Sequence, residues 1–220
     1  MSPRSFLLTD ALAAYVTAHS EPLDPVARDL VARTEALGGV AGMQISPDQS
    51  ALMGVLARLT GARRAVEVGT FTGMSALAVA RALAPGGRLL CCDVSEEWTA
   101  IGREAWEAAG VADRIDLRIG PGAETLAGDL FGDDEPIDLA FVDADKPGYV
   151  TYHDLLVPRL RPGGLLAVDN TLWGGDVVEP DESDANRTAL RAYNDHAVAD
   201  DRVDTVMLTV ADGLTLNVRR

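Results

Sequence analysis

Acidic, amide and ammonium side chains follow two apolar stretches of the sequence, and together they could hold a metal ion. The predicted strand 137–143 closes with Asp143, with Asp145 and Lys146 directly behind it, and the predicted strand 163–170 closes with Asp169 and Asn170. Carboxylates that meet at one point repel each other and raise each other's pKa, and a divalent cation resolves this conflict. Ligands that are all oxygen atoms favour Mg²⁺, with Mn²⁺ or Ca²⁺ as alternatives. We therefore expect Asp143, Asp169 and Asn170 to be metal ligands.

The two residues behind Asp143 suggest further chemistry. Lys146 would stand beside the open positions of the cation, which favours the neutral amine and makes Lys146 a candidate general base. Asp145 need not bind the metal and is expected to face the cofactor. For a single acid, a solvated turn or a helix cap would be the better interpretation. Two acidic strand ends in successive strand–helix units favour a site.

A second cluster lies at the end of an earlier predicted strand, 65–68. Gly69 and Gly73 bracket a tight turn, after which a helix begins with free backbone N–H groups. The spacing is not the G-x-G-x-x-G dinucleotide motif, and Glu67 would repel a pyrophosphate, so a nicotinamide dinucleotide is disfavoured. Asp93, 24 residues after Gly69, suits a ribose contact. An acid that can meet an ammonium group and another that can meet a ribose suit S-adenosylmethionine.

Strand-like and helical segments alternate in an order that would position these residues. Strands are predicted at 65–68, 87–93, 114–120, 137–143 and 163–170, and helices follow near 74–83, 96–109, 124, 149–160 and 184–199. Strand-like runs at 203–210 and 214–218 indicate a closing hairpin. This order predicts an α/β fold, a doubly wound parallel sheet with helices on both faces, whose ligands sit beyond the carboxyl ends of the strands.

The first sixty residues are predicted to be helical, and the sequence Ser46-Pro47-Asp48-Gln49 should begin a helix that runs to about Leu59. We expect one domain over 1–220, with a helical N-terminal cap at 1–60 and a Rossmann-like core at 61–220.

Composition limits the partners and the compartment. The 220 residues are 47% hydrophobic and carry a formal net charge of -15, which makes nucleic acid an unfavourable partner. Cys91 and Cys92 are predicted to be reduced core residues, in keeping with a cytoplasmic protein. The N-terminal segment has the features of neither a signal peptide nor a membrane span, so no membrane partner is expected.

Three motifs carry a resemblance to a known family. The sequences "EVGTFTGMSAL", "FVDADKPGYVTYH" and "VDNTLWGGDVV" resemble the cation-dependent class I O-methyltransferases, the caffeoyl-CoA and catechol O-methyltransferase group. The similarity extends from about Thr9 to the C-terminus. It implies a seven-stranded, mostly parallel, Rossmann-like sheet with a C-terminal antiparallel hairpin, S-adenosylmethionine as methyl donor, and a homodimer.

The resemblance also assigns roles to individual residues. The metal ligands would be Asp143, Asp169 and Asn170, Lys146 would act with Asp143 in catalysis, and the substrate would contact Lys146, Asn170 and Trp173. Residues carried over as cofactor contacts are Ile45, Glu67, Gly69, Thr70, Ser75, Asp93, Gly122, Asp143 and Asp145. Plant members have asparagine where this chain has Gly174, which weakens the case for their thioester substrate, whereas Arg4 matches a lysine near that substrate.

The sequence therefore predicts an enzyme that transfers a methyl group to a hydroxyl of a catechol-type small molecule, either a CoA ester or a phenol of secondary metabolism. Three alternatives stay open at this point. They are a metal-independent small-molecule methyltransferase, a nicotinamide-dependent oxidoreductase, and a protein that binds S-adenosylmethionine without catalysis.

Overall fold

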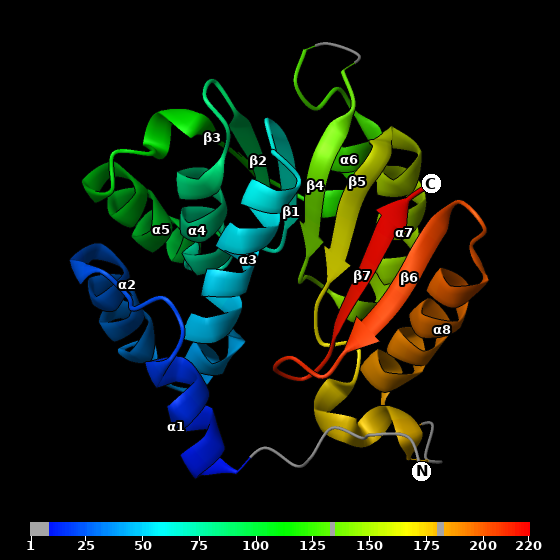
Figure 1. The fold of residues 1–220 in the computed structure, drawn as a ribbon, viewed down its shortest axis with the longest axis horizontal. Coiled ribbons are helices and arrows are strands. Elements are labelled where there is room, and N and C mark those ends of the chain that lie inside the picture. Colours follow the sequence, from blue (N-terminus) through cyan, green and yellow to red (C-terminus); the bar gives the residue numbers. More distant parts are fainter. Residues whose placement is uncertain (1–8, 133–134, 180–182) are drawn as a thin grey trace.

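The computed structural model describes residues 9–132, 135–179 and 183–220, and its centre is one seven-stranded sheet (Figure 1). The strand order is β3-β2-β1-β4-β5-β7-β6, and only β7 runs antiparallel to its neighbours. The strands are β1 (Arg64–Val68), β2 (Arg88–Asp93), β3 (Ile115–Ile119), β4 (Ile137–Val142), β5 (Leu160–Val168), β6 (Val203–Leu208) and β7 (Leu214–Arg219). The predicted parallel sheet and its closing hairpin are confirmed.

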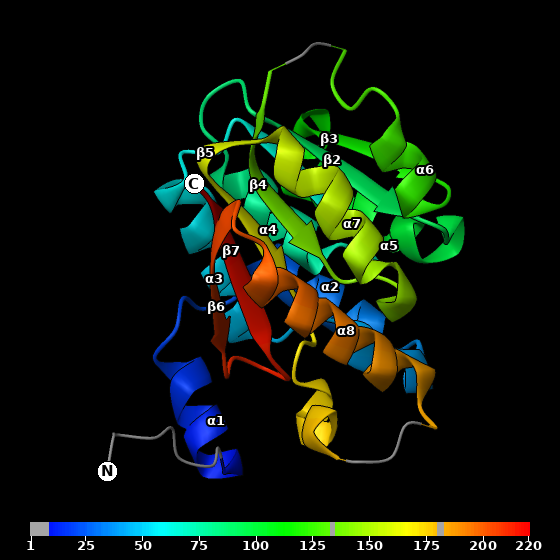
Figure 2. The ribbon, with the colours of Figure 1, turned by 90° about the vertical axis from the view of Figure 1, so that its right-hand side faces the viewer.

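Helices cover both faces of the sheet. One face packs against α2 (Pro25–Glu35), α3 (Pro47–Leu59), α4 (Met74–Ala82) and α5 (Glu96–Ala108), and α1 (Asp10–Ala18) precedes them. The other face packs against α6 (Gly122–Ala127), α7 (Tyr149–Leu156) and α8 (Ala185–Ala199), which lie together in Figure 2. In the described part of the chain, no helix has the length and hydrophobicity to cross a membrane.

Side-chain alternation along β4 explains the two cores. Leu139 and Phe141 pack in the first core, whereas Ala140 and Val142 pack in the second. Because successive side chains of a strand point to opposite faces, a strand that is apolar at every position is buried on both sides. The apolar run 139–142 therefore marks β4 as a central strand, and the polar residues that follow it must lie at the edge of the sheet.

Short 3₁₀ segments connect several elements: Gly38–Met43, Ala112–Arg114, Lys146–Gly148, Val157–Arg159 and Trp173–Val178. Ser46 caps α3 as predicted, since its side chain accepts a hydrogen bond from the backbone N–H of Gln49. This cap fixes the start of α3 close to the carboxyl ends of the strands, where the predicted site lies.

Candidate active site

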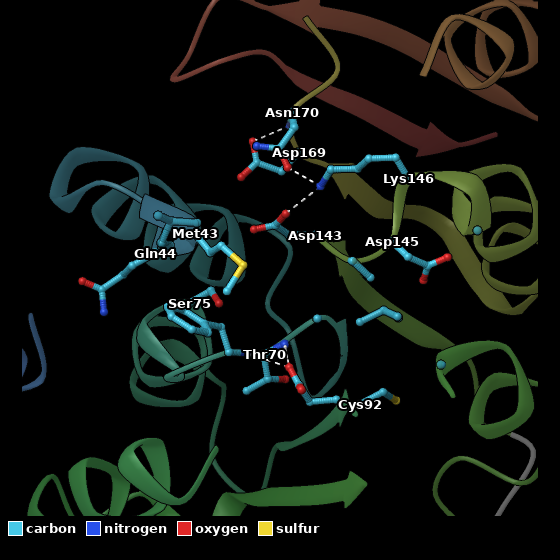
Figure 3. A pocket seen from close by; sticks show the side chains of 18 of the residues that line it. Met43, Gln44, Thr70, Ser75, Cys92, Asp143, Asp145, Lys146, Asp169 and Asn170 are labelled. Atoms are coloured by element: carbon cyan, nitrogen blue, oxygen red, sulfur yellow. Dashed lines mark hydrogen bonds and ion pairs between the residues drawn. The ribbon is translucent and has the colours of Figure 1, made fainter. Parts of the chain in front are cut away.

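The sheet register brings the predicted site residues to one edge. Val68 pairs with Val142 and Val142 pairs with Val168, so β1, β4 and β5 end side by side. The backbone N–H of Asp143 donates to the carbonyl of Val68 at 2.8 Å, and that of Asp169 donates to Val142 at 2.9 Å. Pairing thus continues to the first residue beyond each strand, and the two carboxylates lie next to each other in Figure 3.

One cavity of about 1190 Å³ opens at this edge, between the carboxyl ends of the strands and the N-terminal helices. It exceeds the roughly 300–1,000 Å³ of an ordinary small-molecule pocket, which leaves room for a cofactor and a second small molecule. Twelve of the thirteen predicted site residues line it: Ile45, Gly69, Thr70, Ser75, Asp93, Gly122, Asp143, Asp145, Lys146, Asp169, Asn170 and Trp173.

The acidic centre of the cavity is poorly exposed to solvent. Burial and, to a smaller extent, the neighbouring charge of Asp143 together raise the pKa of the Asp169 carboxyl to about 7. Burial also raises the pKa of Asp143, although the Lys146 ammonium offsets part of this effect. Asp212, from the turn between β6 and β7, adds a third negative charge that acts on both groups. The centre therefore has an excess of negative charge.

Lys146 supplies the positive charge at this centre and is the only lysine in the sequence. Its Nζ donates to Asp143 Oδ1 at 3.1 Å, to the Tyr149 hydroxyl at 2.7 Å and to Asn170 Oδ1. The side-chain nitrogen of Asn170 donates to Asp212 Oδ1 at 2.7 Å, which fixes the orientation of this amide. The oxygen of Asn170 therefore faces Lys146.

The donor set fits a hard divalent cation. Asp143, Asp169 and Asn170 present neighbouring carboxylate and amide oxygens at one end of the cavity, and the surrounding negative charge exceeds that of one ammonium group. Oxygen ligands with excess negative charge are what Mg²⁺ and related cations require. These three residues would hold such an ion.

The turn after β1 is built for close approach of the backbone. Gly69 has φ of +86°, and a Cβ atom there would lie 1.9 Å from the carbonyl oxygen of Asp143, so only glycine fits. The Asp93 carboxylate accepts backbone hydrogen bonds from Thr70 at 2.8 Å, Phe71 at 2.7 Å and Ser95 at 2.7 Å. Asp93 thus shapes the turn, and the ribose contact predicted for it stays a prediction.

Glu67 is the one predicted site residue that does not line the cavity. It is fully buried beneath the turn, and burial raises its pKa to about 8 despite the nearby hydroxyls of Ser75 and Thr70. Among the residues that the structure describes, its Oε2 has no hydrogen-bond partner. An unpartnered buried carboxylate oxygen fits a site that receives a donor such as the ammonium group of a cofactor.

Trp173 begins the 3₁₀ segment beside the cavity and has a positive φ of 49°. Its ring nitrogen donates to Asp184 Oδ2 at 3.3 Å, and Asp184 in turn caps α8. Trp173 therefore both lines the cavity and attaches its loop to α8. Gly174 follows it with a positive φ, and Arg4 lies outside the described residues.

Sequence reasoning missed four residues of the site. The Tyr149 hydroxyl accepts a hydrogen bond from Lys146, and the Tyr152 hydroxyl donates one to Asp145. The Gln49 amide donates to Asp169, and Asp212 accepts from Asn170. The tyrosines had the pattern of packed helix residues, and Asp212 that of a turn. Gln49 was predicted to complete a helix cap. Only their placement at the sheet edge shows their role.

Comparison with known proteins agrees with this geometry. A profile of the O-methyltransferase family matches residues 17–220. Tricin synthase 1 of Oryza sativa subsp. japonica is 44% identical over 79% of this chain and 73% of its own length. Caffeoyl-CoA O-methyltransferase 2 of Zea mays is 38% identical over 97% of this chain and 84% of its own length.

Two solved structures have the same fold. The O-methyltransferase from Bacillus cereus in complex with SAH is 29% identical with a TM-score of 0.88 and covers 96% of this chain and 97% of its own. The O-methyltransferase TomG from Streptomyces achromogenes, in complex with SAM, is 28% identical with a TM-score of 0.86, and the match covers 95% of this chain and 96% of TomG. The oxidoreductase and the non-catalytic binder are thereby disfavoured. The chain belongs to the S-adenosylmethionine-dependent O-methyltransferases of the caffeoyl-CoA O-methyltransferase type.

Proposed function

We propose that this enzyme depends on a divalent cation and methylates one hydroxyl of a catechol-type small molecule. The observation that carries the proposal is that Asp143, Asp169 and Asn170 lie together at one end of the cavity of the predicted cofactor contacts, with Lys146 bonded to two of them. Mg²⁺ is the preferred ion, with Mn²⁺ or Ca²⁺ as alternatives. When bound, the cation would supply positive charge that favours ionisation of the acceptor hydroxyl and fixes a vicinal diol in place.

Lys146 is the proposed proton acceptor. Its Nζ contacts oxygens of two proposed ligands, Asp143 and Asn170, so an acceptor hydroxyl held at the same ligands lies within reach of it. The Tyr149 hydroxyl also contacts this nitrogen and keeps it directed toward the centre. The charge of a bound cation would favour the neutral amine of Lys146, which would then take the proton of the hydroxyl while the oxygen attacks the methyl carbon and the bond between that carbon and the sulfonium sulfur breaks.

The methyl donor would occupy the cavity on the side of Gly69, Thr70 and Asp93, and the acceptor the side of Trp173. Asp145 also lines the cavity, and its carboxylate accepts a hydrogen bond from the Tyr152 hydroxyl. An attacking oxygen and a methyl carbon that are held in line need little further reorganisation, so positioning provides much of the rate gain. The Trp173 ring would exclude water from the acceptor.

The acceptor class rests on the ligand set and on the relatives' names. Three protein ligands leave positions at which two adjacent hydroxyls of a vicinal diphenol can bind. Such a diphenol includes both a phenol of secondary metabolism and the caffeoyl group of a CoA ester. Rates with free caffeic acid and with caffeoyl-CoA under the same conditions distinguish these two acceptors.

The decisive test is methyl transfer from labelled S-adenosylmethionine to a panel of vicinal diphenols with Mg²⁺ and with EDTA. We expect turnover with Mg²⁺, loss of turnover in EDTA, and recovery on addition of excess Mg²⁺. Asp169→Ala should abolish turnover and still bind S-adenosylmethionine, and Asp113→Ala, which changes an exposed acid before β3, serves as the matched control. Full activity of the wild-type enzyme in EDTA would refute the metal role and favour metal-independent methylation.

A homodimer in the cytoplasm is also proposed. Strand β6 forms an edge of the sheet, and its register with β7 places Val206 and Val218 on one face, where both are exposed. Apolar side chains on an open edge strand favour pairing with a second copy. Light scattering of the purified protein should give twice the chain mass, and a monomer at micromolar concentration would refute the dimer.

A further inference from the structure

Gln49 connects the N-terminal helices to the acidic centre of the cavity. It occupies the first turn of α3, and the residue is 1% exposed. Its Nε2 donates to Asp169 Oδ2 at 2.6 Å, across 120 positions of the sequence. A buried amide that bonds a carboxylate so far away in the chain is a specific tertiary contact, and helix formation alone does not require it.

The bond completes a two-point hold on Asp169. Its other oxygen, Oδ1, accepts the backbone N–H of Asn170 at 2.8 Å. Two donors from different segments fix the plane of the carboxylate, whereas one donor would leave the group free to turn. Each carboxylate oxygen offers more than one lone-pair site, so both oxygens keep capacity for a further partner. The carboxylate of Asp169 is thus held in one orientation, and its oxygens can still accept another ligand or donor.

The donor is itself held rigidly. The backbone N–H of Gln49 bonds the side chain of Ser46 at the start of α3, while Met53, Leu56 and Ala57 of the same helix are buried in the core. A displacement of the amide would therefore require movement of the packed helix. This is the arrangement expected of a group that sets the geometry of a ligand.

We propose that Gln49 is a positioning residue that orients Asp169 for the divalent cation and thereby couples the packing of α3 to cation affinity. This inference rests on the proposed cation dependence. The Gln49 amide would not touch the cation or the substrate; it acts through Asp169.

Cation binding to Gln49→Met tests this role directly, because methionine fills a similar volume and lacks the donor. Mn²⁺ affinity is measured by electron paramagnetic resonance and S-adenosylmethionine affinity by calorimetry, neither of which needs turnover. We expect the Mn²⁺ Kd to rise about tenfold or more, as for other residues that orient metal ligands. The S-adenosylmethionine Kd should stay within about twofold, because Gln49 acts on Asp169 rather than on the turn after β1.

Gln44→Met is the matched control. Gln44 also lines the cavity, but its amide donates to Thr34 at 2.8 Å and to Thr72 at 3.1 Å, away from the carboxylates. Its Mn²⁺ Kd should stay within about twofold of the wild-type value. If Gln49→Met does not fold, Gln49→Asn keeps an amide that is one methylene too short for Asp169 and carries the same expectation.

The outcomes separate this inference from the proposed function. If the wild type binds Mn²⁺ and a folded Gln49 variant binds it with the same affinity, the positioning role is overturned and the proposed function stays intact. A wild-type chain that binds no Mn²⁺ and turns over in EDTA would overturn both. Equal weakening by the Gln44 and Gln49 variants would also overturn the inference, since it would indicate a general loosening of the N-terminal helices.

Discussion

Removal of the Lys146 ammonium should destabilise the ligand-free enzyme. Lys146→Met keeps most of the side-chain volume but leaves Asp143 Oδ1, the Tyr149 hydroxyl and Asn170 Oδ1 without their shared donor. A hydrogen bond to a charged group contributes about 1.5–3 kcal/mol. The side chains of Lys146 and Asp143 are only 10% and 19% exposed, so solvent screens the pair incompletely.

We therefore expect a loss of about 2 kcal/mol in the free energy of unfolding. For a chain of 220 residues, this loss corresponds to a fall in Tm of about 4–8 °C. Differential scanning fluorimetry at pH 8.5 without divalent cations measures it. Arg220→Met is the control, because Arg220 and Asp204 form an exposed pair whose removal should change Tm by less than about 2 °C.

The pH dependence gives a second check on the same variant. Burial raises the pKa of Asp143, and Lys146 opposes that rise, so the carboxyl takes up a proton more readily in the variant. A protonated Asp143 needs no cationic partner. The deficit should therefore be largest at pH 8.5 and smaller at pH 5.5, and Mg²⁺ should raise the Tm of the variant more than that of the wild type. A variant that melts within 1 °C of wild type at pH 8.5 refutes this reasoning.

Three further predictions concern other residues. Because burial raises the pKa of Glu67 to about 8, the free energy of unfolding of the ligand-free wild type should fall as the pH rises from about 4 to 8. Urea unfolding should show a smaller fall for Glu67→Gln, and calorimetry should show that this variant binds S-adenosylmethionine more weakly. Gly69→Ala places a Cβ against the Asp143 carbonyl and should lower the free energy of unfolding by about 3 kcal/mol or more, as measured by urea unfolding. A variant as stable as the wild type would contradict the structure. Hydrogen bonds from Arg202 hold the pKa of Asp200 well below its usual range, so the Asp200 carboxylate stabilises the fold at pH 7. The wild type should therefore be more stable than Asp200→Asn at pH 7. In acid titrations this difference should shrink as the pH falls below about 4.

Apolar periodicity and strand-end chemistry were enough to predict the order of elements and most of the cavity. Strand β4 is apolar at nearly every position, and the acid after it could only lie at the sheet edge. Since β4 and β5 are neighbours, Asp143 and Asp169 meet there, as their positions in successive strand–helix units suggested. Local pattern and parallel-sheet topology together determine these positions.

Contacts between distant segments could not be read from such patterns. Gln49 has the spacing of a helix cap, and its backbone does serve that cap, but its side chain bonds a residue of another segment. Glu67 has the sequence position of a cofactor contact, but its side chain is fully buried beneath the turn and does not line the cavity, so the predicted contact stays a prediction. The direction of a side chain at a strand end depends on tertiary packing, which one sequence does not specify.

Lys146 is the only lysine of the chain, and arginine takes every other position counted among its lysines and arginines. Amine-directed reagents therefore have few places to react: the terminal amine, and a nitrogen enclosed by Asp143, Tyr149 and Asn170. Reductive alkylation with ¹³C-formaldehyde would give one lysine resonance, which requires no assignment by mutagenesis. That single resonance would monitor the electrostatics of the reaction centre in solution.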